Sequence, residues 1–355
     1  MTDPRHNGVS HANGHHVADS EQGVSKRMKI LVIGGTTFIG RHLVSQLVKQ
    51  EHEVTILHRK PAHEFGKKVE NLQADRNDPE QMQRALAGKD FDALFDNAYD
   101  WERGTPASVV DALGKLLCGH VGRYVFMSSV AAYGDGLNHH EGDALAPDDW
   151  PDRYARHKAQ SERVLFKLHQ RFGLPVVTLR PPFIYGPANP FYREQFFWDR
   201  MRDKRPLILP GDGRRLMQFV YVKDLVAAML KAVESPSAVG HAFNIANPRA
   251  LTQAEFIELL AAAAGKETKL VRIPRERILR AGGHPMGPHL YFGVYFDLAP
   301  ITMLVNKAQR MLAFKPCSMA EGLKETYRWY QRHHERPALD YGFENQILGL
   351  AQIAS

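Results

Sequence analysis

Apolar residues recur along this chain in two patterns, short β-rich runs and longer segments with helical spacing, and the two alternate from Met28 onward. Such alternation predicts an α/β fold with a doubly wound parallel sheet and helices on both faces. The expected strands are 28–34, 53–58, 70–73, 92–96, 123–129 and 175–180, and the first expected helices are 38–50, 78–87, 106–118 and 153–172.

After Arg180 the pattern loosens into loops, short strands and further helices. This change predicts a smaller mixed α/β lobe at 181–335, partly interleaved with the sheet domain at 28–180, and a C-terminal tail at 336–355. We expect the lobe to close over the carboxyl ends of the strands, where open α/β sheets bind ligands. The helices expected here are 191–203, 222–233, 252–264 and 319–333.

The first 27 residues are polar and carry four histidines without an apolar core, so they match neither a secretory signal nor a transit helix. Their composition predicts a disordered extension at 1–27 rather than a metal site. Cys118 and Cys317 lack zinc spacing and imply no disulfide framework, which favours the cytoplasm. The chain has no run of 18 apolar residues, so we expect no membrane span.

The formal net charge is +7, and basic residues concentrate at 202–215 and 266–280. Such patches serve nucleic acid, a phosphorylated small molecule or only solvent. No aromatic-interleaved RNA motif is present. A solvated face is therefore the leading interpretation, and a phosphate-bearing ligand is the second.

The stretch MKILVIGGTTFIG at 28–40 is an apolar strand that runs into a glycine-rich turn and then a helix. Glycines at such a junction let backbone amides and the helix N-terminus approach a pyrophosphate closely. We therefore predict a Rossmann-type dinucleotide site. Its phosphate-binding turn would consist of Gly34, Gly35, Thr36, Thr37, Phe38, Ile39 and Gly40.

His58 ends the second strand, at the place where a site for NAD normally carries an acid that binds the adenosine ribose. Arg59 and Lys60 follow, and an arginine binds a 2′-phosphate that a carboxylate would repel. NADP is therefore the expected cofactor, and NAD is the alternative if both are ordinary surface residues. Further cofactor contacts are expected from Asp75 to the adenine amino group, and from Asn97 and Ala98 beside the ribose.

Tyr154 and Lys158 are spaced i and i+4 near the start of an amphipathic helix and so share one helix face. An ammonium near a phenol favours the phenolate, so we expect Lys158 to lower the Tyr154 pKa from its usual ~10. Ser129 ends the fifth strand, where its hydroxyl could hold a substrate oxygen against Tyr154. A Tyr-x-x-x-Lys pair also arises by chance, but here a strand-end serine and a dinucleotide turn precede it.

Seven motifs give the chain a family resemblance: GGTTFIG, SSVAAYG, YARHK, LRPPFIYGP, GDGRRLMQFVYVKDL, HAFNIANP and NKAQRMLAFKP. Over about residues 28–335 it resembles the extended short-chain dehydrogenases/reductases of the NAD-dependent epimerase/dehydratase family. Its turn and its RHK-type helix are most similar to the branch containing chloroplast stem-loop binding proteins. The resemblance implies a Rossmann domain, a nicotinamide cofactor and a catalytic set of Ser129, Tyr154 and Lys158. It also implies a homodimer formed through a four-helix bundle of the helices 106–118 and 153–172.

The chain departs from the family pattern at several positions. Thr37 replaces the middle glycine of the turn, where its hydroxyl could bond phosphate or its bulk could weaken binding. Val130 and Ala131 replace the Asp-Glu pair of the dehydratases, so 4,6-dehydration is not expected. Phe183 and Met217 take the places of an asparagine and an arginine that bind UDP-sugars. The resemblance assigns Pro182 to the cofactor, and Ser129, Tyr133, Phe183, Arg215 and Arg275 to the substrate, with Arg214 as another source of positive charge.

The leading interpretation is an enzyme that transfers hydride to or from a secondary alcohol or ketone of a sugar nucleotide or related small molecule. Reduction and epimerisation both fit it. The second interpretation is an RNA-binding or RNA-processing protein like the chloroplast relatives, supported by the basic patches. A third is a dinucleotide-sensing scaffold, in which Thr37 permits binding without turnover.

Overall fold

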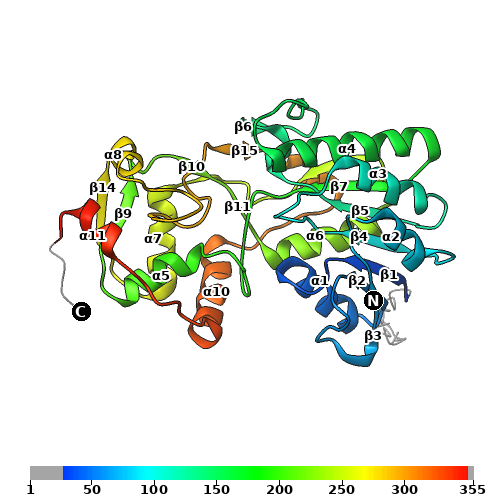
Figure 1. The fold of residues 1–355 in the computed structure, drawn as a ribbon, viewed down its shortest axis with the longest axis horizontal. Helices are drawn as coiled ribbons and strands as arrows, with labels where there is room; N and C mark the ends of the chain where they lie inside the picture. Colours follow the sequence, from blue (N-terminus) through cyan, green and yellow to red (C-terminus); the bar gives the residue numbers. More distant parts are fainter. Residues whose placement is uncertain (1–26, 351–355) are drawn as a thin grey trace, which may run out of the picture.

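The computed structural model describes residues 27–350, and its largest element is a parallel sheet with the strand order β12-β7-β5-β4-β1-β2-β3 (Figure 1). The order reverses between β1 and β4, as in a doubly wound Rossmann sheet. The predicted fold class is therefore confirmed, whereas the extension predicted at 1–27 lies outside the described residues apart from Arg27. The strands are β1 (Lys29–Ile33), β2 (Glu53–His58), β3 (Val69–Gln73), β4 (Ala93–Asp96), β5 (Tyr124–Met127), β7 (Val176–Arg180) and β12 (His241–Asn244).

Helices cover both faces of this sheet, which is why its strands read as continuous apolar runs. Ile30 and Val32 of β1 pack toward α1 and α6, whereas Leu31 and Ile33 pack toward α2, α3 and α4. The side chains alternate between faces because the period of a strand is two residues. These helices are α1 (Phe38–Lys49), α2 (Pro79–Leu86), α3 (Ala107–Leu116), α4 (Arg153–Phe172) and α6 (Val222–Glu234).

The outermost strand β12 was not among the expected strands. It pairs in parallel with β7, so that Ala242 lies opposite Thr178. Both β12 and α6 fall inside the range expected for the smaller lobe, yet they lie with the sheet. The chain therefore leaves the sheet after β7, builds part of the lobe, and returns to complete the sheet.

The smaller lobe packs around an aromatic core at the other end of the molecule (Figure 1). The parallel pair β9 (Leu207–Pro210) and β14 (Leu270–Ile273) lies at its outer end. Its helices are α5 (Glu194–Arg202), α7 (Gln253–Ala264), α8 (Arg275–Arg280), α10 (Met319–His333) and α11 (Gly342–Leu348). The fully buried rings include Phe196, Phe197, Trp198, Phe219, Phe256, Phe292 and Phe296.

Helix α11 lies within the range expected for the C-terminal tail. Its Glu344 accepts a 2.9 Å hydrogen bond from Nε of Arg200 on α5, and the side chains of both residues are almost fully buried. A buried carboxylate needs such a partner because desolvation of an unpaired charge is costly. The pair therefore ties the end of the described chain to the core of the lobe.

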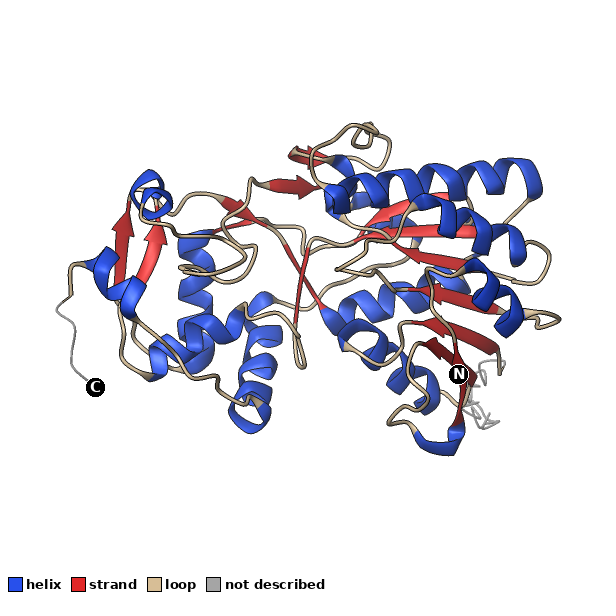
Figure 2. Cartoon of the chain, viewed as in Figure 1, coloured by secondary structure: helices blue, strands red, loops and turns tan. Residues whose placement is uncertain are grey.

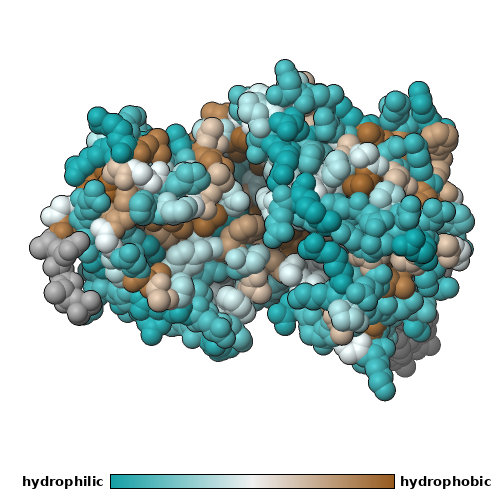
Figure 3. Space-filling view, viewed as in Figure 1, coloured by the Kyte–Doolittle hydropathy of each residue, from teal (hydrophilic) through white to brown (hydrophobic). Residues whose placement is uncertain are grey.

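Short strand pairs join the sheet domain to the lobe (Figure 2). On the face drawn in Figure 3, the surface is hollowed between the two parts, and apolar side chains show inside the hollow. Among the helices of residues 27–350, none combines the length and the apolar character that a bilayer span requires. The remaining elements are β8 (Phe183–Tyr185) with β11 (Phe219–Tyr221), β10 (Leu216–Met217) with β13 (Leu251–Thr252), β6 (Gly136–His139) with β15 (Ile301–Met303), α9 (Asn306–Met311) and three single helical turns, η1 (Gly66–Lys68), η2 (Val130–Tyr133) and η3 (Pro236–Ala238).

Candidate functional site

The glycine turn between β1 and α1 is built as the sequence predicts. Gly34 has a φ of +81°, and a Cβ there would lie 3.2 Å from the amide nitrogen of Ala98. A Cβ on Gly40 would collide with the carbonyl oxygen of Gly34. Both glycines are therefore required for α1 to begin directly against the end of β1, where its N-terminus favours an anion.

Thr37 is the N-cap residue of α1, and its side chain makes no capping hydrogen bond. It is exposed and lines an open pocket of about 330 Å³ together with Thr36 and Lys60. The Thr37 hydroxyl is thus free to meet a ligand at the helix N-terminus. The ring of Phe38, by contrast, packs into the core of the smaller lobe, and Ile39 packs beside it.

Asn97 follows β4 and carries both of its amide atoms buried without a hydrogen-bond partner in residues 27–350. Buried amides are normally bonded, so an unpaired one beside a phosphate-binding turn indicates a ligand. Asn97 lies next to Ala98, which contacts Gly34 across the strand-order reversal. The turn, the free Thr37 hydroxyl and this amide together fit a dinucleotide.

His58, Arg59 and Lys60, at the end of β2, differ in whether other residues of the protein bind their side chains. Nε2 of His58 lies 2.6 Å from the Oδ1 of Asn71, so the ring is held by the neighbouring strand. The Arg59 side chain is 66% exposed, and its Nη1 lies 3.5 Å from a carboxylate oxygen of Asp100. Lys60 has no ion pair within the described chain and faces the pocket beside Thr37. Two cationic side chains, one of them paired with Asp100, thus lie on this side of the turn.

Asp75, expected near the adenine, is already bonded within the protein. Arg103 lies between two carboxylates, with its Nη2 2.7 Å from Asp75 and 2.7 Å from Asp100. Asp100 also meets Arg59, so these four residues form one chain of charges along the edge of the site. Sequence reasoning missed Arg103 and Asp100 because they lie in a loop without a recognisable motif.

Helix α4 is fixed over the carboxyl ends of β5 and β7 by a buried carboxylate, Glu162. Nη2 of Arg180 lies 2.7 Å from Glu162, and the hydroxyls of Ser128 and Thr178 also donate to it. At the start of the helix, Asp152 accepts a 2.6 Å hydrogen bond from the amide of Ala155. These contacts determine where the first two turns of α4 lie.

Tyr154, in the first turn of α4, and Ser129, just after β5, lie near each other. Ser129 is 9% exposed and lies near the Tyr154 phenol, whose pKa it lowers against the larger effect of burial. Oγ of Ser129 also accepts from the amide of Ala131, which fixes its rotamer. The two side chains are therefore neighbours at the carboxyl edge of the sheet.

Lys158 lies one turn further along α4, where it is buried. Its ammonium donates a 2.6 Å hydrogen bond to the carbonyl oxygen of Met127 and lies over the rings of Tyr99, Phe126 and Tyr154. Burial raises the pKa of Tyr154 to about 12 and lowers that of Lys158 to about 8. This direction is opposite to the one we expected for Tyr154, because the ammonium is directed to a main-chain carbonyl rather than to the phenol.

Two aromatic residues after β4 cover Tyr154. The Trp101 ring stacks on Tyr154 with centroids 5.0 Å apart, and Tyr99 meets it edge-on at 4.8 Å. The Tyr99 hydroxyl lies 3.2 Å from Nδ1 of His157. Sequence reasoning missed both rings, although aromatic residues directly after a strand that ends at the site are the signal that could have found them.

The residues that the family resemblance assigns to the substrate, and Pro182, which it assigns to the cofactor, lie in different parts of the structure. Tyr133 donates to Asn244 and accepts from Arg180, and its ring stacks on His139. Its hydroxyl is committed to this internal network. Pro182 lies half-buried between β7 and β8, and Phe183 begins β8.

Arg215 and Arg275 meet at a buried carboxylate, Asp297. Arg215 lies 3.2 Å and Arg275 2.8 Å from it, and Tyr291 also donates to it. Both arginines therefore belong to an internal ion-pair cluster, and the substrate role expected for them stays a prediction. Asp297 thus pairs with two arginines that the sequence alone suggested were available to a ligand.

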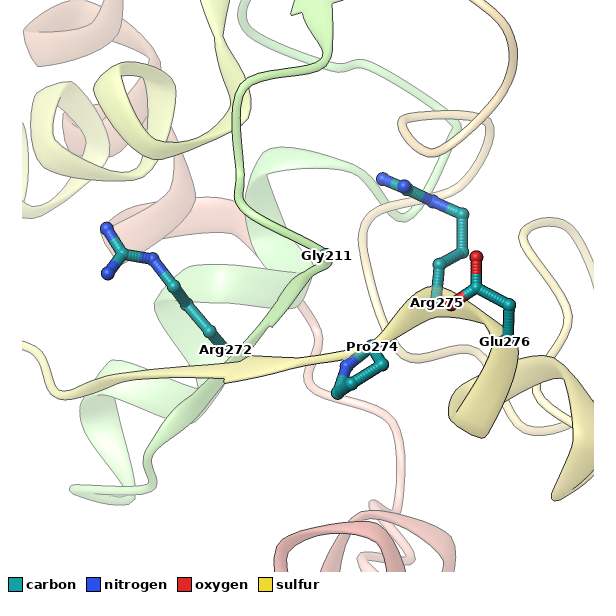
Figure 4. Close-up of a pocket in the computed structure, with 5 residues that line it drawn as sticks. All are labelled: Gly211, Arg272, Pro274, Arg275 and Glu276. Atoms are coloured by element: carbon teal, nitrogen blue, oxygen red, sulfur yellow. The ribbon is translucent and has the colours of Figure 1, made fainter.

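Arg275 also lines an open pocket of about 390 Å³ with Gly211, Arg272, Pro274 and Glu276. In Figure 4 the side chains of Arg272 and Arg275 point to opposite sides of the backbone, so they do not form a joint anion site. This pocket lies at the outer end of the smaller lobe, beside β14 and α8, away from the sheet that carries Tyr154 (Figure 1).

Phe183 belongs to an aromatic group that extends from the lobe toward Trp101. Phe191 meets Trp101 edge-on at 5.7 Å and Tyr295 at 5.9 Å, whereas Phe183 meets Phe296 at 5.0 Å. These contacts bridge the two parts of the molecule beside Tyr154.

Comparison with known proteins relates these features to a family. The model of the NAD dependent epimerase/dehydratase family matches residues 30–246. A chloroplast stem-loop binding protein of 41 kDa from Arabidopsis thaliana is 30% identical over 346 residues, which cover 91% of this chain and 85% of that protein. A dTDP-glucose 4,6-dehydratase from Actinoplanes is 26% identical over 337 residues, covering 86% and 98%.

Solved structures show the same fold at lower identity. The dTDP-glucose 4,6-dehydratase of Bacillus anthracis in complex with NAD has a TM-score of 0.70 at 19% identity, covering 86% of this chain and 97% of that one. The UDP-glucuronic acid 4-epimerase of Bacillus cereus in complex with NAD has a TM-score of 0.67 at 20% identity, with the same coverage. At these identities the likeness concerns the fold alone.

Proposed function

The chain belongs to the NAD-dependent epimerase/dehydratase family, and on this premise we propose that it is an NAD(P)-dependent enzyme acting on a secondary alcohol or ketone. The observation that carries the proposal is the proximity of Ser129 to Tyr154 at the carboxyl edge of the sheet. Two hydroxyls that converge there can hold and protonate one substrate oxygen. The glycine turn begins at the same edge of the sheet.

The dinucleotide would be held by the glycine turn at its phosphates and by Asn97 near its ribose. A bound nicotinamide supplies hydride to a carbonyl carbon or accepts it from an alcohol carbon. We propose NADP rather than NAD, because Lys60 and the largely exposed Arg59, once it leaves Asp100, can bind a 2′-phosphate and His58 replaces the usual acid. Thr37 would donate its hydroxyl to the pyrophosphate.

Tyr154 would give a proton to the substrate oxygen during reduction and take it back during oxidation. Ser129 would hold that oxygen in place, because its rotamer is already fixed by Ala131. Lys158 would supply a positive charge beneath the phenol and bind the cofactor ribose. Dehydration is not proposed, because Val130 and Ala131 put no carboxylate next to Ser129.

Reduction and epimerisation use the same residues, and they differ in whether the ketone leaves or is rotated and reduced again. We propose a sugar nucleotide or a related small molecule as the substrate, since two relatives are named for dTDP-glucose and UDP-glucuronic acid. Mass spectrometry of small molecules that co-purify with the protein tests this. Recovery of NADP(H) or NAD(H) would support the proposal, whereas a protein that neither retains nor binds either dinucleotide would contradict it.

RNA binding is the second candidate, because the Arabidopsis relative at 30% identity is named for stem-loop binding. If RNA binds to the basic patches, affinity should fall linearly with the logarithm of salt concentration. Stepwise loss of sub-micromolar RNA binding on neutralising Arg272, Arg277 and Arg280 in turn would favour this function over the enzyme.

We also propose a homodimer formed through α3 and α4, which pack side by side on one face of the sheet (Figure 1). Leu116 and Phe166 on these helices are only partly buried within the monomer. A mass of about twice 40.1 kDa by light scattering would support the dimer. A monomer at micromolar concentration would contradict it.

A further inference from the structure

Arg193, just before α5, is surrounded by aromatic side chains, which its position in the sequence does not reveal. It is the N-cap residue of α5 and is 9% exposed. The centre of its guanidinium lies 4.6 Å from the ring centroid of Phe191 and 5.2 Å from that of Phe183, with Tyr295 and Phe296 each at 5.6 Å. A cation is thus held among four aromatic rings.

The hydrogen-bonding capacity of this guanidinium is mostly unused. Nε donates a 3.2 Å hydrogen bond to the carbonyl oxygen of Val294. Within residues 27–350, neither Nη1 nor Nη2 makes a hydrogen bond, and no carboxylate lies within ion-pair distance of Arg193. A buried arginine with a purely structural role normally has its donors satisfied, as Arg180 has with Glu162.

The neighbouring Glu194 does not fill this gap. Its Oε2 accepts from Asn189, while its Oε1 has no partner in the described chain. Burial raises the pKa of Glu194 to about 7, which weakens it as a counter-charge. The cation is therefore both desolvated and incompletely neutralised.

Arg193 also lies close to the proposed reacting centre. Phe191, which packs under its guanidinium, meets Trp101, and Trp101 stacks on Tyr154. The positive charge of Arg193 acts on the Tyr154 phenol and lowers its pKa, against the larger effect of burial. An anion bound at Nη1 and Nη2 would thus lie beside a substrate oxygen held by Tyr154.

We infer that Arg193 is a substrate-binding residue that takes an anionic oxygen group, a carboxylate or a phosphate, on the same molecule that Tyr154 protonates. The inference rests on the proposed function, because it places that group next to the reacting carbon. The free Nη1 and Nη2 can bind two oxygens of one group. The substrate class is then an anionic hydroxy or oxo compound rather than a neutral one.

Calorimetric titration of the full chain with malonate, and separately with inorganic phosphate, tests this inference. Saturating NADPH should be present, so that the cofactor's own phosphate sites are filled. Arg193→Met keeps most of the side-chain stem but removes the cation, and we expect it to weaken binding of the preferred anion at least about tenfold. Arg193→Lys, which keeps the charge but not the paired donors, should lose less. Arg202→Met, at the exposed end of the same helix, is the matched control and should bind like the native protein.

The unfolding temperature of each variant must be compared with that of the native protein, because Arg193 packs among four rings. If Arg193→Met is unfolded, the comparison of Arg193→Lys with the native protein decides. Anion binding that is equally strong in native protein and Arg193 variants, or absent from the native protein, would overturn the inference. NADPH binding in the same samples reports separately on the proposed function, so the two can fail independently.

Discussion

The ammonium of Lys158 donates a 2.6 Å hydrogen bond to the main-chain carbonyl oxygen of Met127, the last residue of β5. This bond fixes a buried cation 5.4 Å from the ring centroid of Tyr99 and 5.7 Å from that of Tyr154. Burial lowers the pKa of Lys158 to about 8. The lysine is thus held in place at a cost in stability.

The pH dependence of folding should reveal that cost. Between the folded pKa of about 8 and the ordinary value of 10.5, the unfolded chain holds more protons on Lys158, so its contribution to the free energy of unfolding rises with pH. Below pH 8 the full penalty applies. Lys158→Met should therefore stabilise the protein at pH 7 by about 2 kcal/mol, after the lost hydrogen bond is subtracted.

Urea denaturation of native protein and Lys158→Met, from neutral pH to pH 10.5, measures this difference. It should shrink as the pH rises above 8. Lys167→Met, at an exposed position on the same helix, should show no such trend. A stability difference that stays constant across this range would contradict the prediction.

Tyr154→Phe removes the hydroxyl near Ser129 but keeps the ring that stacks on Trp101. Turnover should fall by ~10²-fold or more, while dinucleotide binding survives. Steady-state kinetics and fluorescence titration measure the two effects. Tyr327→Phe, on a ring packed in the lobe core, is the control and should keep native rates. Native turnover in Tyr154→Phe would remove Tyr154 from the mechanism.

Arg59 should determine the choice of cofactor. Its side chain is largely exposed, and its one ion pair within residues 27–350 is a 3.5 Å contact with Asp100, so it can turn to a 2′-phosphate. We expect tighter binding of NADPH than of NADH. In Arg59→Ala the difference between the two affinities should be smaller. Arg84→Ala, an exposed arginine on α2, should leave the difference unchanged. Equal affinities for the two cofactors in the native protein, measured by fluorescence titration, would refute the assignment.

Thr37 offers an uncommitted hydroxyl at the N-terminus of α1. If that hydroxyl bonds the pyrophosphate, Thr37→Gly should weaken dinucleotide binding by about 0.5–1.5 kcal/mol, and by up to about 3 kcal/mol for a bond to a charged oxygen. Thr37→Ser keeps the hydroxyl and should bind almost as the native protein does. Tighter binding by the glycine variant would mean that Thr37 only crowds the phosphates.

Local patterns predicted most of the fold. The six expected strands and eight expected helices are present, because each shows a clear period or a strong cap, as Asp78 provides for α2. Strand β12 was missed because His241–Asn244 is too short to show alternation. Its place is determined by pairing with β7, which depends on the tertiary fold.

In the candidate site, too, local patterns predicted some features and not others. The family resemblance is confirmed, and Ser129 and Tyr154 meet because a strand end and a capped helix determine their positions. The sequence does not predict which residues surround an individual charged side chain. Nothing near Arg275 in the sequence predicts Asp297 as its partner, and nothing near Arg193 predicts that it makes no ion pair within residues 27–350.

Because β12 follows β7 only after a long insertion, the order of synthesis affects how the sheet can form during translation. When β7 has emerged, its outer edge has no neighbour, because β12 is synthesised only after a large part of the lobe. The nascent sheet therefore exposes a row of unpaired backbone groups, the kind of edge that invites aggregation. A fragment that stops after Arg180 would carry that open edge permanently, so the dinucleotide-binding half should not be obtainable as a well-behaved protein by truncation at that residue.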